Sequence, residues 1–240
     1  MAQTDQNYSW IDTTQGAQDA CAILQVCSRI AVDIEGINLG RDGKICIIQI
    51  ATDLNEIFLF DIVTLSQEAF DAGLKEIFES STIQKIIFDC RQDCDALLHQ
   101  YNTRMRRVCD CQVALMSTRD RVRADRLTGL KRALASSTVI PASDIQEVEH
   151  IKEEGINLFA EEKGGSYAVW EERPLHPMLK KYCCVDIQYL LPLYDSYLTK
   201  LARKRTLLTI ESTSQIRADY HMDLEIPMEN DKSRALRDFK

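Results

Sequence analysis

The segment that decides the fold is Arg29-Ile-Ala-Val-Asp-Ile-Glu35, in which large apolar side chains alternate with small or acidic ones. Successive side chains of an extended chain point to opposite faces, so the isoleucines and the valine share one face while Asp33 and Glu35 share the other. The pattern predicts a strand with two carboxylates on one face. Inside a core these charges need a compensating cation, which indicates a metal site; an exposed strand face is the alternative. Because 37 acidic residues produce such pairs by chance, the rest of the sequence must decide.

Four further strands are expected around this one. The glycine-containing turn at 40–43 leads into residues 44–51, a nearly continuous apolar run suited to a central strand, and residues 57–60 complete an antiparallel meander. A fourth strand is expected at 85–88 and a short fifth one around Val108.

Apolar spacing of three to four residues predicts helices at 13–26 and 67–79, and another directly after the fourth strand. Further helices are expected up to about Ser136, and a long final helix at about 174–202. Strands first pair as hairpins and later alternate with helices, so the predicted class is α/β with a mixed five-stranded sheet flanked by helices.

A single domain with a tail is the simplest organisation: a domain over residues 1–203, then a C-terminal helix and a polar tail over 204–240 whose composition is typical of disorder. Residues 207–219 have enough apolar side chains to dock on their own domain, on a protein partner or on a second copy of the chain, and the sequence leaves these open. No apolar run of about 18 residues and no secretion signal occur, so we expect no membrane association and an intracellular location, cytoplasmic or nuclear.

Charge is unevenly distributed. The net charge of −8 argues against a polyanionic partner, because phosphate contacts usually come from Lys and Arg. However, residues 104–132 contain nine basic and three acidic residues, which suits a nucleic-acid backbone; a solvated helical face explains them equally well. Residues 144–172 contain nine acidic and two basic residues and are expected to form an acidic loop. Nine cysteines without C-x-x-C pairs are interpreted as reduced thiols.

Two further positions complete a candidate site. Asp93 lies in the first turn of the helix after the fourth strand, where Asp89 and Asp95 compete for the same role and where a carboxylate also simply complements the helix dipole. Tyr182 and Asp186 are four residues apart and share a helix face. A packed tyrosine beside a solvated aspartate is the alternative interpretation.

Taken together and in order, these segments resemble a known superfamily. Val32-Asp-Ile-Glu-Gly36, Lys85-Ile-Ile-Phe-Asp-Cys-Arg-Gln-Asp93, Trp170-x-x-Arg-Pro-Leu175 and Tyr182-x-x-x-Asp186 resemble the motifs of the DEDDy 3′-5′ exonucleases, which include RNase D and the proofreading domains of DNA polymerases. The resemblance covers residues 30–201 and implies a ribonuclease H-like (DnaQ-like exonuclease) fold.

Additional motifs resemble one branch, the exonuclease 3′-5′ domain-containing proteins related to Egalitarian. They are Gly36-Ile-Asn-Leu-Gly-Arg-x-Gly-Lys-x-x-x-Ile-Gln-Ile50, Leu59-Phe-Asp61, Asp89-Cys-Arg91 and Asp110-x-Gln-Val-Ala114. One departure is Phe88-Asp89, where relatives more often carry His-Asp or His-Gly.

The resemblance implies two Mg²⁺ or Mn²⁺ ions held by four carboxylates, Asp33, Glu35, Asp93 and Asp186. It further implies that Tyr182 orients the attacking water and that Leu39, Arg41 and Lys44 contact the terminal nucleotide, although a plain hairpin turn also explains the last three. The expected activity is release of nucleoside monophosphates from the 3′ end of single-stranded nucleic acid, RNA in preference to DNA.

An RNA-binding adaptor that works through protein partners, with little or no catalysis, is the alternative. Some members of the Egalitarian-related branch have lost their carboxylates and act in this way. This sequence keeps all four carboxylates and the tyrosine, which favours an enzyme.

Overall fold

The computed structural model describes residues 8–118, 127–201 and 204–219. The strands are β1 (Tyr8–Ile11), β2 (Arg29–Ile37), β3 (Lys44–Thr52), β4 (Ile57–Asp61), β5 (Gln84–Ile87) and β6 (Val108–Asp110). The helices up to β6 are α1 (Thr14–Leu24), α2 (Ile62–Leu65), α3 (Gln67–Ala69), the π-helical turn η1 (Phe70–Leu74), α4 (Lys75–Glu79) and α5 (Arg91–Tyr101). Those after it are α6 (Cys111–Ser117), α7 (Leu130–Ala135), α8 (Ile145–Phe159), the 3₁₀ turns η3 (Glu161–Lys163) and η4 (Tyr167–Trp170), α9 (Pro177–Gln188), α10 (Leu190–Lys200) and α11 (Lys204–Asp219).

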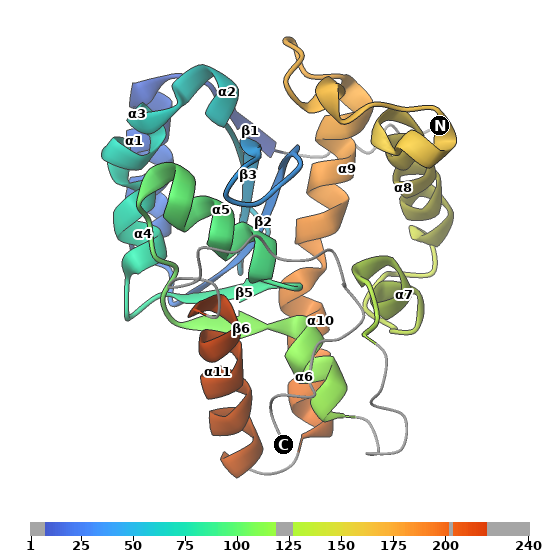
Figure 1. The fold of residues 1–240 in the computed structure, drawn as a ribbon. Helices are drawn as coiled ribbons and strands as arrows, with labels where there is room; N and C mark the ends of the chain where they lie inside the picture. Colours follow the sequence, from blue (N-terminus) through green and yellow to red (C-terminus); the bar gives the residue numbers. More distant parts are fainter. Residues whose placement is uncertain (1–7, 119–126, 202–203, 220–240) are drawn as a thin grey trace.

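The strands form one mixed sheet in the order β1-β4-β3-β2-β5-β6 (Figure 1). β2, β3 and β4 form the predicted antiparallel meander, and β5 and β6 add parallel strands beside β2. The α/β class is confirmed, but the expected number of five strands is one too few. The missed strand, β1, pairs in parallel with β4 at the edge of the sheet. Of its four residues only Ile11 is fully buried, and a run of four is too short for its alternation to be distinguished from chance.

Helices cover both faces of the sheet (Figure 1). On one face α1, α4 and α5 pack over the side of β2 that carries Ile30, Val32 and Ile34. On the other face lie α9 and α10, and α8 packs outside α9. Because side chains alternate along β2, its carboxylates point toward the α9 side. The predicted strand faces therefore place Asp33 and Glu35 between the sheet and α9.

The expected acidic loop at 144–172 is wrong over its first half, which forms the helix α8. Its buried residues Val148, Ile151, Lys152 and Gly155 follow helical spacing, while the acidic side chains Glu149 and Glu153 are exposed. Only two of the four buried positions are large and apolar, and this hid the helical periodicity in the sequence.

The single helix expected at about 174–202 consists of two helices. α9 ends at Gln188, and Tyr189, with a φ/ψ of −101°/−1°, separates it from α10. His176 caps the start of α9 by accepting a hydrogen bond from the backbone N–H of Met178, and Pro177 occupies the first turn, where its missing N–H costs nothing.

α11 packs against β6 and α6, and Ile210, Ser214 and Arg217 are buried there. Residues 207–219 therefore dock on their own domain. The polar tail expected after them and the centre of the basic stretch, residues 119–126, lie outside the described residues. All nine cysteines are free thiols. Within the described ranges, no helix combines the length and the hydropathy needed to cross a membrane.

Lys85 stabilises the junction between α4 and β5. Its buried Nζ donates hydrogen bonds to the backbone oxygens of Ser80 (2.7 Å), Ile83 (2.8 Å) and Ile77 (3.4 Å). We expect Lys85→Met to leave these oxygens without that donor and to lower the free energy of unfolding by about 2 kcal/mol in urea denaturation. The exposed control Lys131→Met should change it by less than about 0.5 kcal/mol. Equal effects of the two variants would contradict this role.

Candidate metal centre

Asp33 and Glu35 lie on the central strand β2, next to an irregularity in its pairing. The register between β2 and β3 shifts between Glu35 and Gly36, as in a β-bulge, which changes the direction of neighbouring side chains. A Cβ on Gly36 would lie 3.3 Å from the backbone nitrogen of Cys46 and closer still to the backbone of Lys44, so glycine is required there. The irregularity therefore begins directly after the second carboxylate, Glu35.

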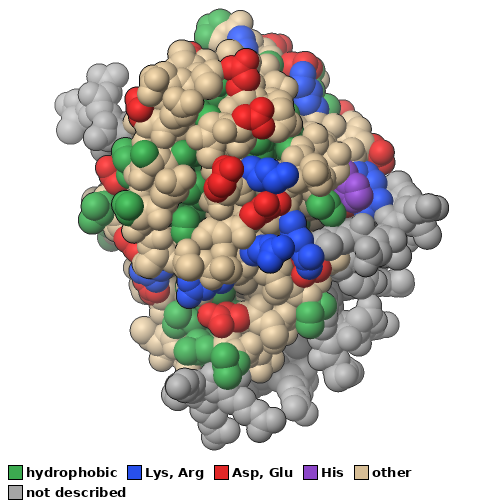
Figure 2. Space-filling view, turned by 90° about the vertical axis from the view of Figure 1, so that its left-hand side faces the viewer, with side chains coloured by type: hydrophobic (Ala, Val, Ile, Leu, Met, Phe, Trp, Pro, Cys, Tyr) green, Lys and Arg blue, Asp and Glu red, His purple; other side chains and the backbone are tan. Residues whose placement is uncertain are grey.

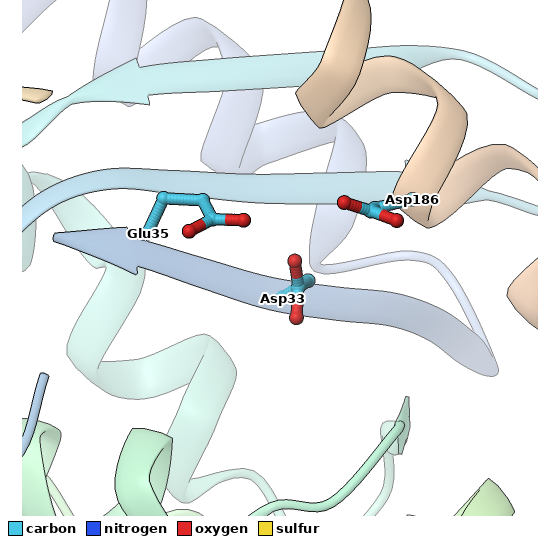
Figure 3. Close-up of side chains that lie close together, drawn as sticks. All are labelled: Asp33, Glu35 and Asp186. Atoms are coloured by element: carbon cyan, nitrogen blue, oxygen red, sulfur yellow. The ribbon is translucent and has the colours of Figure 1, made fainter. Parts of the chain in front are cut away.

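Asp186 reaches the same place from α9 and lies opposite β2 (Figure 3). Within the described residues, ligand oxygens of Asp33, Glu35 and Asp186 all lie within 4.8 Å of one another. Gln49, the residue directly across from Asp33 on β3, donates an Nε2 hydrogen bond of 2.5 Å to the Asp33 carboxylate. The structure thus brings three of the four expected carboxylates into one cluster.

The cluster concentrates negative charge in surroundings only partly open to water, because Asp186 is buried and Asp33 and Glu35 are partly exposed. Burial, and then the charge of Asp186, raises the pKa of Asp33 to about 7. Burial also raises the pKa of Glu35, and the charges of Asp33 and Asp186 raise it further. These shifts mean that the ionised cluster needs a cation. Carboxylate oxygens are hard ligands, so the donor set fits Mg²⁺ or Mn²⁺.

Asp93 lies in the first turn of α5, is 6% exposed, and belongs to the surroundings of the cluster rather than to the three-residue group. Burial, and then the charge of Asp33, raises its pKa. The two competitors are in ion pairs with arginines: Asp89 with Arg91 and Asp95 with Arg41. Of the three, Asp93 is the one whose pKa the charge of Asp33 raises, and its role as a fourth ligand stays a prediction.

Tyr182 lies one turn before Asp186 on α9, so the two side chains share a helix face, and the side chain of Tyr182 lowers the pKa of Asp186 against the raising effect of burial. Its ring packs against Phe159 (5.4 Å between centroids) and Trp170 (6.2 Å). A Cβ on Gly155 would lie within 3.0 Å of three Tyr182 atoms, so α8 approaches the ring closely only because this residue is glycine. Burial, and then the charge of Asp186, raises the pKa of Tyr182, which remains a neutral phenol.

Lys152 is a site residue that the sequence reasoning missed. Its Nζ, supplied by α8, forms an ion pair with Asp186 and lies 3.7 Å from the centroid of the Tyr182 ring. One signal was present: Lys152 is one of two basic residues in the acidic stretch, and its spacing from Val148 and Gly155 places it on the same helix face.

The expected nucleotide-contacting residues follow the candidate ligands on the β2–β3 hairpin. Arg41 forms an ion pair with Asp95 (Nη2 to Oδ1, 2.7 Å), and Lys44 forms one with Glu171. Leu39 is partly buried against the core on the α5 side. These contacts tie the hairpin to α5 and to the segment before α9, and a contact with a nucleotide stays a prediction.

Other motif residues act as anchors around the site. Arg173 binds Asp61 through two hydrogen bonds (2.8 and 2.5 Å), which join β4 to the segment before α9. Arg217 of α11 donates to Asp110 (2.6 Å) and Asp89 (3.0 Å), and Asp110 accepts from the backbone N–H groups of Asp89 (2.9 Å) and Cys90 (3.2 Å). This network fixes the turn that leads into α5 and Asp93.

The raised pKa of Asp33 predicts a pH dependence of stability. The pKa of Asp33 is about 7 in the folded protein and 3.8 in model peptides. In the presence of a chelator, the contribution of Asp33 to the free energy of unfolding is therefore fully present below pH 4 and is lost as the pH rises to 7. The unfolding free energy of wild type minus that of Asp33→Asn should therefore decrease between pH 5 and pH 7, by at most about 1.4 kcal/mol per pH unit. Urea denaturation in EDTA measures it, and a constant difference would contradict the shift.

Comparison with known proteins gives consistent results. A family model described as 3′-5′ exonuclease matches residues 8–202. The mouse piRNA biogenesis protein EXD1 is 34% identical over 196 residues, which cover 78% of this chain and 32% of the mouse protein. A Caenorhabditis elegans Egalitarian homologue is 31% identical over 86 residues, 35% of this chain and 15% of that protein. The chain thus spans about a third or less of the length of these relatives.

A solved structure confirms the fold. Trypanosoma brucei RNase D in complex with RNA U12 superposes with a TM-score of 0.73 at 26% identity, and the match covers 96% of this chain and 76% of that one. The expected ribonuclease H-like fold and the resemblance to RNase D and Egalitarian are therefore confirmed, and this chain belongs to the 3′-5′ exonuclease family of the DnaQ-like superfamily.

Proposed function

We propose that this chain is a divalent-metal-dependent 3′-5′ exonuclease that releases nucleoside monophosphates from single-stranded nucleic acid, RNA in preference to DNA. The observation that carries the proposal is the cluster of Asp33, Glu35 and Asp186, whose ligand oxygens lie within 4.8 Å of one another. Family membership supports the same chemistry.

In this proposal the four carboxylates have different roles. Asp33, Glu35 and Asp186 would hold the divalent ions, with Asp33 shared between them, Glu35 and Asp186 serving the nucleophile side and Asp93 serving the leaving-group side. When bound, two divalent ions supply activation of a water molecule and charge that steadies the leaving 3′ oxygen. Gln49 holds the Asp33 carboxylate in place. The neutral hydroxyl of Tyr182 orients the attacking water by hydrogen bonding.

The preference for RNA rests on relatives: the RNase D structure contains RNA, and the mouse relative is named for piRNA biogenesis. Figure 2 shows the side of the molecule that carries α1 and α4, where acidic and basic side chains are interspersed rather than gathered in a basic patch. We therefore do not place the nucleic-acid path on that face. The basic stretch at 104–132 stays the proposed path.

An RNA-binding adaptor is the second candidate, and the ion pair between Lys152 and Asp186 favours it. A lysine that permanently neutralised the cluster would stabilise the fold without supporting hydrolysis. Measuring nuclease activity separates the two functions.

The deciding experiment uses matched RNA and DNA single strands with 3′-hydroxyl ends, in Mg²⁺ and in Mn²⁺, with wild type beside Asp33→Asn. We expect stepwise shortening from the 3′ end with release of monophosphates, faster on RNA. Asp33→Asn should reduce the rate of shortening at least about 100-fold, because the loss of a metal ligand costs several kcal/mol of transition-state stabilisation. RNA that binds but is not shortened under any condition would leave only the adaptor.

Tyr182→Phe tests the assignment of the hydroxyl separately. It keeps the ring and its packing but removes the group that orients water, so kcat should fall about 100-fold while Mn²⁺ affinity stays unchanged. Single-turnover kinetics and calorimetric Mn²⁺ titration measure the two quantities. A variant with wild-type kcat would exclude the hydroxyl from the reaction.

A further inference from the structure

Lys152 reaches the carboxylate cluster from a helix that contributes no carboxylate to it. Its side chain is 7% exposed and that of its partner Asp186 is 4% exposed, so water screens this ion pair little. The flat side of the Tyr182 ring covers the ammonium at 3.7 Å from the ring centroid, a cation–π contact that further stabilises the charged amine in this position.

The ammonium acts on the whole cluster, not on Asp186 alone. The positive charge of Lys152 opposes the effect of burial on the pKa values of Asp33, Glu35 and Asp186. The contact that the structure gives to Asp33 comes from the neutral amide of Gln49. In the described part of the chain, Lys152 is thus the cation that partly neutralises the negative charge of the cluster. A bound divalent ion would neutralise the same charge.

The carboxylate of Asp186 cannot bind the Lys152 ammonium and a divalent ion equally well at the same time. A divalent ion at Asp186 would be repelled by an ammonium on the same carboxylate, in surroundings where buried charges interact strongly. α8 itself is firmly packed through Val148, Ile151 and Gly155, so the helix is held in place. The lysine side chain has a flexible four-carbon stem, and its rotation can remove the ammonium from Asp186.

We propose that Lys152 is a built-in competitor of the divalent metal: its ammonium occupies Asp186 in the metal-free protein, and metal binds fully only when that ammonium withdraws. This inference rests on the proposed function for one point, the assignment of Asp186 as a metal ligand. The competition lowers metal affinity, because the ammonium must leave Asp186 before an ion can bind it.

The test is calorimetric titration of Mn²⁺ into the full chain, without substrate, comparing wild type with Lys152→Met. Methionine keeps the apolar stem and removes the charge, so Mn²⁺ should bind at least about tenfold more tightly. Lys152→Arg keeps the positive charge and should bind as weakly as wild type. Lys163→Met removes the other, exposed lysine of the acidic stretch and should leave the affinity unchanged.

Thermal unfolding gives a second measurement on the same variants. In EDTA, Lys152→Met should melt below wild type because the buried carboxylates lose their cation, and its gain in Tm on adding Mn²⁺ should exceed that of wild type. Lys152→Gln serves as a second neutral variant if the methionine variant does not fold.

The outcomes are distinguishable. Equal Mn²⁺ affinity of wild type and both neutral variants, or weaker binding by the neutral variants, overturns the competition while leaving the proposed nuclease intact. Absence of Mn²⁺ binding in all variants overturns both proposals. If Lys152→Met binds Mn²⁺ more tightly and neither it nor wild type shortens RNA or DNA, the competition is supported and the proposed function is overturned.

Discussion

The packing of α9 against β2 buries Asp186 opposite Asp33 and Glu35, and the rest of the site depends on how this negative charge is compensated. Unpaired charges in a protein interior are costly, and the raised pKa values of the carboxylates express that cost. Within the protein, the ion pair of Lys152 with Asp186 supplies part of this compensation. A divalent ion with two positive charges would compensate the cluster more completely, which is the physical basis for regarding this face of the sheet as a metal centre.

Two arginine networks hold the elements that carry the carboxylates. Arg173 joins the segment before α9 to Asp61 at the end of β4. Burial alone would raise the pKa of Asp61, but hydrogen bonds from Arg173 keep that pKa below its ordinary value. Arg217 connects α11 to Asp110 and so to the turn that precedes Asp93. The C-terminal helix therefore supports the site although it supplies no ligand, and the segments with the most recognisable motifs are positioned by ion pairs outside the cluster.

Much of the fold and most of the cluster could be predicted because they depend on local patterns. Alternation along β2 determined which face carries Asp33 and Glu35, and helical spacing placed Tyr182 and Asp186 together on α9. What the sequence did not reveal depends on tertiary contacts. β1 is an edge strand of only four residues, too short for a recognisable pattern, and α8 buries Lys152 where helical patterns require an apolar residue. A lysine in an acidic stretch suggests a solvated surface unless its partner across the core is known.

The measurement that tests the account most directly is anomalous diffraction from crystals grown with Mn²⁺. The account predicts manganese peaks within coordinating distance of the Asp33, Glu35 and Asp186 oxygens, and Lys152 turned away from Asp186. Crystals saturated with Mn²⁺ that show no peak at these carboxylates, with Lys152 still paired to Asp186, would contradict the assignment of this cluster as a divalent-metal centre.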